Sequence, residues 1–397
     1  MSDENIVIVA AKRTPIGAFM GALTNFSAPE LGAAAIQAAI EDAKLTPAQI
    51  DETLMGCVLP AGLGQAPARQ AALKAGLPDT VGATTINKVC GSGMKAVMQA
   101  CDAIKAGSSR VVVAGGMESM SNAPYLLKKA RQGYRLAHEK IYDHMMLDGL
   151  ENAYDGQSMG CFAQAKANEE KLSRSAMDEF ALNSLHKAQN AQKEGYFAQE
   201  ICAIDLNSKN KKSDELHSFL EDEGPLRAKP EKIPLLKPAF ALDGTITAAN
   251  SSSISDGAAA LVLMTESEAR RQNLTPLASI TGYTTHAMQP AEFTVAPVHA
   301  IDKLLQKVQW SPADVDAFEI NEAFAMVTML TQQKLDIDPA KINLHGGACA
   351  LGHPIGASGA RIIVTLVHAL KTHSLKRGIA SLCIGGGEAT AIAIEVK

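Results

Sequence analysis

The sequence predicts an α/β protein built from a duplicated unit, with a mostly parallel sheet that is covered by helices on both faces. Two observations carry this prediction. Apolar, strand-like segments alternate with helical patterns along the chain, and such alternation is typical of parallel sheets covered by helices. The second half of the chain also repeats the first, and an internal repeat constrains the whole architecture.

The repeat is clearest in two helical segments. AIQAAIEDAKLTPAQID ends at Asp51 and AIDKLLQKVQWSPADVD ends at Asp316, an offset of 316 − 51 = 265 residues. Two further matches follow in the same order, 91–93 (GSG) with 357–359 (ASG) and 110–119 with 379–389. Several matches in one order indicate a duplication rather than chance.

Each element of the first half has its own signal. The apolar stretch NIVIVAA at 5–11 predicts a buried strand. Ser27 and Glu30 then form a capping-box pattern, which predicts the start of a helix. A second strand is expected in 52–59, and a third at 110–114 follows a helix whose apolar residues recur from Met94. Strand and helix therefore alternate throughout this half.

Residues 121–247 have no counterpart in the second half and are predicted to form an inserted loop domain. They include a helical pattern at about 175–195 and a polar run around 207–215. Binding residues concentrate in such long excursions. The domains expected are a first half made of 1–120 plus 248–275, the insertion at 121–247, and a second half at 276–397.

Composition excludes several classes of protein. The formal net charge of −5 gives no electrostatic basis for binding nucleic acid or an anionic membrane. No apolar run reaches the roughly 18 residues of a membrane helix, and the start of the chain lacks a secretory pattern. The seven cysteines are an odd number without a CxxC pair, so we expect no metal site and a reducing, cytoplasmic location.

Cys90 is the first candidate for chemistry. It precedes two glycines and a helical pattern in NKVCGSGMKAV. A helix N-terminus favours a thiolate, which predicts a reactive cysteine with a lowered pKa. The alternative is an inert buried cysteine, since free cysteines are usually core residues.

Three later segments carry similar candidates. His353 lies in the glycine-rich loop of GGACALGHPIGASGAR, and Asn321 in EINEAFA is predicted to be a helix N-cap. Cys383 ends an apolar strand before three glycines, whose backbone N–H groups are suited to an oxyanion hole. Two cysteines and a histidine beside glycines indicate acyl transfer through a thioester. The rival is metal binding, which requires three or four ligands at regular spacing.

Taken together, VCGSG, GGMESMS, NEAFA, GGACALGHPIGASGAR and CIGGGEA resemble the thiolase family of the biosynthetic type, in family order and over essentially the whole chain. The resemblance implies the thiolase fold. In that fold two similar βαβαβαββ halves stack as five layers, αβαβα, and a loop domain is inserted in the first half. It also implies a homotetramer, with dimers in some members.

The resemblance further implies the reaction of an acetyl-CoA C-acetyltransferase, in which two acetyl-CoA molecules condense reversibly to acetoacetyl-CoA and coenzyme A. Cys90 would be the nucleophile and His353 its proton acceptor. Cys383 would be the acid/base at the α-carbon. Asn321 would hold a water that completes a first oxyanion hole with His353, and the N–H groups of Cys90 and Gly385 would form a second one.

Coenzyme A and its acyl esters would be substrates, with no permanently bound cofactor. The positions that match the family's coenzyme A contacts are Leu150, Met159, Arg227, Phe240, Ala248, Ser252 and Phe324.

Ser158 leaves acyl-chain length open. Family members specialised for acetoacetyl-CoA often carry a histidine where GQSMG places Ser158. The alternatives are therefore a broader-chain 3-ketoacyl-CoA thiolase of fatty-acid degradation, another condensing enzyme such as a ketoacyl synthase, and a non-catalytic acyl-CoA-binding protein. Neither of the last two requires Cys90, His353 and Cys383 together.

Overall fold

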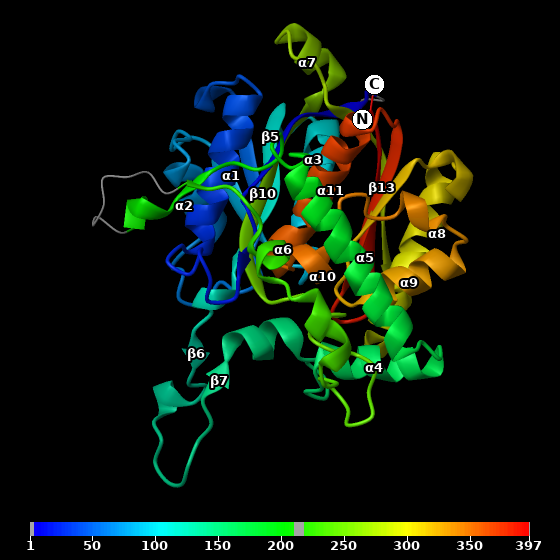
Figure 1. Ribbon diagram of the computed structural model, residues 1–397. Coiled ribbons are helices and arrows are strands. Elements are labelled where there is room, and N and C mark those ends of the chain that lie inside the picture. The colour runs from blue at the N-terminus through cyan, green and yellow to red at the C-terminus, as the bar shows by residue number, and fades with distance from the viewer. Residues whose placement is uncertain (1–3, 210–217, 397) are drawn as a thin grey trace.

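Each half of the chain folds into a strand-and-helix unit, and the two units lie side by side (Figure 1). The computed structural model describes residues 4–209 and 218–396. The first unit contains β1 (Ile6–Arg13), α1 (Ala28–Asp42), β3 (Glu52–Gly56), α2 (Pro67–Lys74), β4 (Gly82–Ile86), α3 (Ser92–Ala106), β5 (Val111–Ser119) and β10 (Ser255–Thr265). The second contains β11 (Ala278–Ala287), α8 (Ala296–Val308), β12 (Ala317–Ile320), α9 (Ala325–Lys334), α10 (Ala348–Leu351), α11 (Ile355–Thr372), β13 (Arg377–Ile384) and β14 (Glu388–Glu395).

The strands of both units join in one hydrogen-bonded path, β12-β13-β14-β11-β1-β10-β5-β3-β4. The units meet where Ile6–Ile8 of β1 pairs with Ala278–Ile280 of β11. Parallel pairing occurs only toward the two ends of this path. At one end β3 pairs with both β4 and β5, and at the other end β12 pairs with β13. The expectation of a mostly parallel sheet is therefore wrong for the centre, because each unit ends in two strands that return antiparallel.

Alternate residues of the strands face different cores, and this produces five layers. Val111 of β5 packs on the side of α1 and α2, whereas Val112 packs on the side of α3 and α11. In β14, Ile392 faces α3 and α11, and Ala391 faces α8. Figure 1 shows the same order across the molecule, from α1 and α2 through the paired helices α3 and α11 to α8. The predicted αβαβα arrangement is confirmed.

The repeat is visible in hydrogen bonds. Asp51 accepts from two backbone N–H groups where β5 begins, at 2.8 and 3.0 Å. Asp316 accepts from two N–H groups where β13 begins, both at 2.9 Å. The halves differ at the third strand, because the counterpart of β4 is only an isolated bridge between Phe318 and Ile342.

Helices α3 and α11 approach closely at their N-terminal ends. A Cβ on Gly93 would lie 2.8 Å from the backbone nitrogen of Ala360, and one on Gly359 would meet the backbone of Met94. Contacts under 3.0 Å do not occur at real Cβ atoms, so these positions require glycine. The two helix ends therefore meet in the middle layer, one from each half.

The segment between β5 and β10 forms a separate set of elements, most of them short, with α5 the exception at 20 residues. These are β6 (Tyr125–Leu126), β7 (Tyr142–Asp143), α4 (Met159–Glu169), α5 (Arg174–Lys193), β8 (Ile204–Asp205), β9 (Ser218–Phe219) and α6 (Glu223–Arg227). The β6–β7 hairpin projects from the body of the molecule (Figure 1). Within residues 4–209 and 218–396, none of the helices is both long and apolar enough to cross a membrane.

Candidate active site

A largely apolar cavity of about 430 Å³ lies at the N-terminal end of α3, beneath the inserted segment. It gathers residues from the first half, the insertion and the second half. Of the residues predicted from the sequence, those that line it are Cys90, Leu150, Met159, Phe240, Ala248, Ser252, Phe324, His353, Cys383 and Gly385. Residues distant in sequence thus meet at one site.

Cys90 is placed by a strained turn before α3. Val89 has a φ of 45°, which a β-branched residue adopts only under constraint, and Gly91 caps the helix. The N–H groups of Gly385 and of Cys90 itself lower the pKa of the Cys90 thiol, but burial has the larger effect and raises that pKa to about 11. The predicted lowering of the Cys90 pKa is therefore wrong, because desolvation outweighs the helix end.

His353 lies in the loop before α11 and is buried. Its Nδ1 is 2.6 Å from the hydroxyl oxygen of Ser358, and that hydroxyl donates to the Pro354 carbonyl at 2.9 Å. The Ser358 oxygen then accepts from Nδ1–H, which leaves Nε2 as the basic nitrogen. Among the described residues Nε2 has no hydrogen-bond partner. Burial, together with the charge of Arg361, lowers the pKa of His353 to about 3.

Asn321 does not cap a helix, contrary to the sequence prediction. Helix α9 begins at Ala325, and Phe324 is its N-cap. The misplacement arises because four residues without helical structure separate the end of β12 from the start of α9. Asn321 is 1% exposed and is not among the residues that line the cavity, but its Nδ2 is 3.4 Å from Nδ1 of His353, which does line it. Asn321 is therefore connected to the site by its contact with His353.

Cys383 is buried near the end of β13, and it lines the same cavity as Cys90. Burial raises the pKa of Cys383 well above its usual range, and the neighbouring Cys90 adds to the effect. The turn that follows has positive φ at Gly386 (92°) and Gly387 (89°), which favours glycine there. This turn brings the Gly385 N–H onto the Cys90 sulfur.

Phe240 and Phe324 form an edge-to-face pair, with ring centroids 6.1 Å apart, in the wall of the cavity. Arg227 is the one predicted contact residue outside this wall. It ends α6, is exposed and lies 3.6 Å from Glu223.

Two buried residues near the site escaped the sequence analysis. Ser358 orients His353, as described above. Glu118 accepts hydrogen bonds from the N–H groups of Val58 (3.0 Å), Leu59 (3.1 Å) and Gly356 (2.9 Å), and burial raises its pKa to about 7. The sequence could have indicated Glu118, because a charged residue in the apolar strand of GGMESMS requires hydrogen-bond partners when it is buried.

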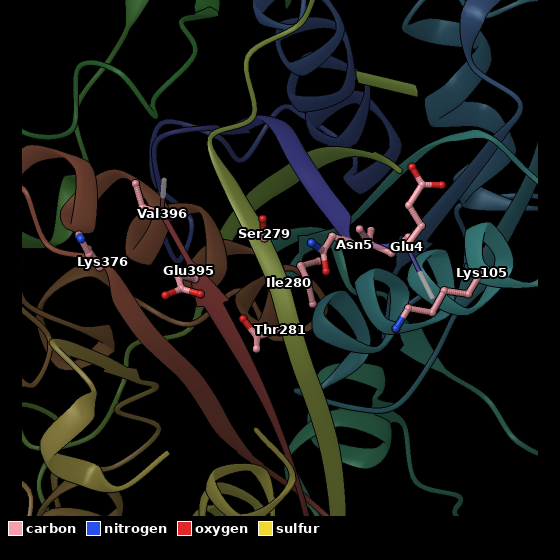
Figure 2. Close-up of a pocket in the computed structure, with 10 residues that line it drawn as sticks. Glu4, Asn5, Lys105, Ser279, Ile280, Thr281, Lys376, Glu395 and Val396 are labelled. Carbon is pink, nitrogen blue, oxygen red and sulfur yellow. The ribbon is translucent and has the colours of Figure 1, made fainter. Parts of the chain in front are cut away.

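A second cavity, of about 480 Å³, lies near the other end of α3, where Lys105 is in the last turn. Figure 2 shows Glu395 and Lys376 on one side of β11 and Glu4 and Lys105 on the other. Its described lining has two acidic and two basic side chains but no cysteine or histidine. At 1.5 Å per helical residue, the length of α3 separates it from Cys90 by about 20 Å.

Comparison with known proteins identifies the family. The sequence pattern of the thiolase N-terminal domain matches residues 6–267, and that of the thiolase C-terminal domain matches residues 274–396. The chain belongs to the thiolase family.

Relatives of this thiolase support the same conclusion over the full length. An acetyl-CoA acetyltransferase from Escherichia coli is 49% identical over 99% of both chains. The crystal structure of the Bacillus anthracis acetyl-CoA acetyltransferase superposes with a TM-score of 0.95, at 43% identity and 99% coverage of each chain. That of a thiolase from Ascaris suum in complex with coenzyme A gives a TM-score of 0.93, at 41% identity over 99% of this chain and 100% of the other.

Proposed function

We propose that this thiolase is an acetyl-CoA C-acetyltransferase, which condenses two acetyl-CoA molecules into acetoacetyl-CoA and releases coenzyme A. The reaction is reversible and proceeds through an acetyl thioester on Cys90. The observation that carries the proposal is the convergence of Cys90, His353 and Cys383 in one cavity, with the Gly385 N–H directed at the Cys90 sulfur. The relatives named acetyl-CoA acetyltransferase support this function over broader-chain thiolysis.

The first half-reaction moves an acetyl group to Cys90. The thiol sulfur attacks the carbonyl carbon of acetyl-CoA while His353 Nε2 takes the thiol proton. Both partners are neutral at rest, because burial raises the pKa of Cys90 and lowers that of His353. The proton therefore moves as the bond forms. The oxyanion is held by the N–H groups of Cys90 and Gly385.

Cys383 then supplies the proton for the departing coenzyme A thiolate. Its raised pKa keeps it protonated at rest, so it becomes a base only after this proton has left. The state that results carries an acetyl group on Cys90, a protonated His353 and a Cys383 thiolate. The last two stabilise each other as an ion pair within the apolar cavity.

The second half-reaction forms the carbon–carbon bond. The Cys383 thiolate takes an α-proton from a second acetyl-CoA, and the enolate oxygen is stabilised by His353 and a water held by Asn321. The enolate carbon attacks the acetyl carbon, the bond to the Cys90 sulfur breaks, and His353 returns its proton to that sulfur. Acetoacetyl-CoA leaves, and all three groups regain their resting protonation.

Substitution of each cysteine separates the two half-reactions. Cys383→Ala should still accept a labelled acetyl group on Cys90, more slowly than wild type because coenzyme A must then leave as an unprotonated thiolate. Condensation should fall further, by about 10²–10⁴-fold, the usual cost of a missing general base. Cys90→Ala should lose both steps. Mass spectrometry of the acetylated protein, beside a steady-state assay, measures them. Condensation by Cys383→Ala at near the wild-type rate would remove Cys383 from the mechanism.

The inserted segment provides much of the acyl-CoA site in this proposal. Leu150, Met159 and Phe240 come from it and line the cavity. We take 121–247 as a coenzyme A-binding domain between a first half (1–120 with 248–275) and a second half (276–397). Arg227, exposed outside the cavity, would contact the adenine end of the ligand.

We also propose a homotetramer in the cytoplasm. The projecting β6–β7 hairpin exposes large apolar side chains, including Tyr125, Leu136 and Ile141, and Leu136 is 91% exposed. Exposed apolar clusters of this kind mark protein contacts. Analytical ultracentrifugation of the full chain, and of a Leu136→Glu variant that should dissociate, tests the assembly.

A further inference from the structure

Arg361 is a fully buried cation that the mechanism above does not use. It lies on α11, two turns after His353, and is 2% exposed. Its Nη1 donates to Glu319 Oε1 at 2.9 Å, and its Nη2 lies 3.5 Å from Asn321 Oδ1. Burying a charge in a core is costly even when it is paired. This cation therefore calls for an explanation.

The contact with Asn321 determines which end of the amide faces the site. Oδ1 lies toward the guanidinium, so Nδ2 lies toward His353. The flipped amide would direct its NH₂ group at a cation that only donates hydrogen bonds. Arg361 thus selects the orientation in which Asn321 Nδ2 lies toward the catalytic histidine. Because His353 Nδ1–H donates to Ser358, Nδ2 lies 3.4 Å from Nδ1 without donating to it.

The arginine is not fully satisfied by these contacts. Among the described residues, its Nε has no hydrogen-bond partner. Unsatisfied buried donors cost stability, and such positions tend to be retained for function rather than for folding. Burial lowers the pKa of His353 and the charge of Arg361 adds to this effect, so the imidazole is neutral at rest.

We propose that Arg361 is a positioning residue for the condensation step, which acts through Asn321 and is itself held by Glu319. The residue touches neither the cavity nor the substrate. It holds the Asn321 amide so that the water bound there stabilises the enolate oxygen beside His353. This inference rests on the proposed acetyl-CoA C-acetyltransferase activity.

Arg13 offers a matched control. It is also fully buried and paired with carboxylates, Glu200 at 2.6 Å and Asp222 at 2.7 Å. The hydrogen bonds of its guanidinium lead to these carboxylates and the Thr14 carbonyl, not to a residue of the cavity. A purely structural arginine should behave like Arg13.

The decisive experiment is a double-mutant cycle with purified full-length protein. Arg361→Lys keeps the charge but loses the planar fork, and should lower kcat for condensation by about 10–100-fold with little change in KM for acetyl-CoA. In an Asn321→Ala background the same change should cost less than about 3-fold, because the residue through which it acts is gone. Arg13→Lys should leave kcat within about 2-fold of wild type.

Several outcomes would overturn the inference. One is that Arg361→Lys lowers kcat by the same factor in the wild-type and the Asn321→Ala backgrounds. Another is that Arg361→Lys leaves kcat unchanged. A third is that Arg13→Lys, at similar thermal stability, lowers kcat as much as Arg361→Lys does. If Arg361→Lys does not fold, the pair Arg361→Met with Glu319→Met removes both charges together and is put through the same cycle. Failure of the wild-type protein to make acetoacetyl-CoA would instead refute the proposed function, so the two failures are distinct.

Discussion

The protonation state of Cys90 can be tested directly by alkylation. Burial raises the pKa of its thiol to about 11, so at pH 8 only about one Cys90 in a thousand is a thiolate. In His353→Gln, which fills a similar space without a basic nitrogen, the iodoacetamide rate should rise about tenfold per pH unit from 7 to 10. A thiol with the ordinary pKa of about 8.5 would level off near pH 9.

Wild-type protein should behave differently at neutral pH. There His353 can take the proton during attack, which adds a contribution that does not depend on pH above the low pKa of the imidazole. Peptide mapping identifies the labelled cysteine, and Cys90→Ala is the control. A plateau below pH 9 in His353→Gln, or thiolate ultraviolet absorbance in the resting enzyme, would show that the helix end outweighs burial.

Two other changes probe chain length and stability. Ser158→His should fill part of the acyl cavity and lower kcat/KM for a six-carbon 3-ketoacyl-CoA more than for acetoacetyl-CoA, by about 1–3 kcal/mol per excluded methylene; equal losses on both substrates would show that this position does not set chain length. Glu118→Gln must turn an NH₂ group toward at least one backbone N–H, since both carboxylate oxygens accept. It should cost about 1–3 kcal/mol in urea unfolding, and an unchanged midpoint would contradict the assignment of Glu118 as a required acceptor.

Sequence reasoning succeeded where the signal was local or repeated. The match of Asp51 with Asp316 predicted equivalent positions, and both cap the start of a strand in their own half. The Ser27–Glu30 capping box and the helix after Cys90 are also present. Short-range patterns determine these features, so one stretch of sequence was sufficient.

What the sequence did not reveal depends on distant partners. The pKa of Cys90 is set by the chain that covers it, including the turn at Gly385. The role of Arg361 requires Glu319 and Asn321, which lie about 40 residues earlier. No local pattern announces such contacts, since each residue taken alone is compatible with a helix or a strand.

The meeting of α3 and α11 at Gly93 and Gly359 has a consequence for how this site could arise. An ancestral half-length chain would have needed a second copy of itself to bring two such helix ends together, and every residue would have appeared twice around the axis. Fusion of two copies into one chain would release that constraint. By the match of 91–93 with 357–359, an offset of 357 − 91 = 266 residues, Gly356 stands where the second half would carry a copy of Cys90. The two similar halves can therefore carry different residues, with Cys90 as the nucleophile in one half and Cys383 as the base in the other.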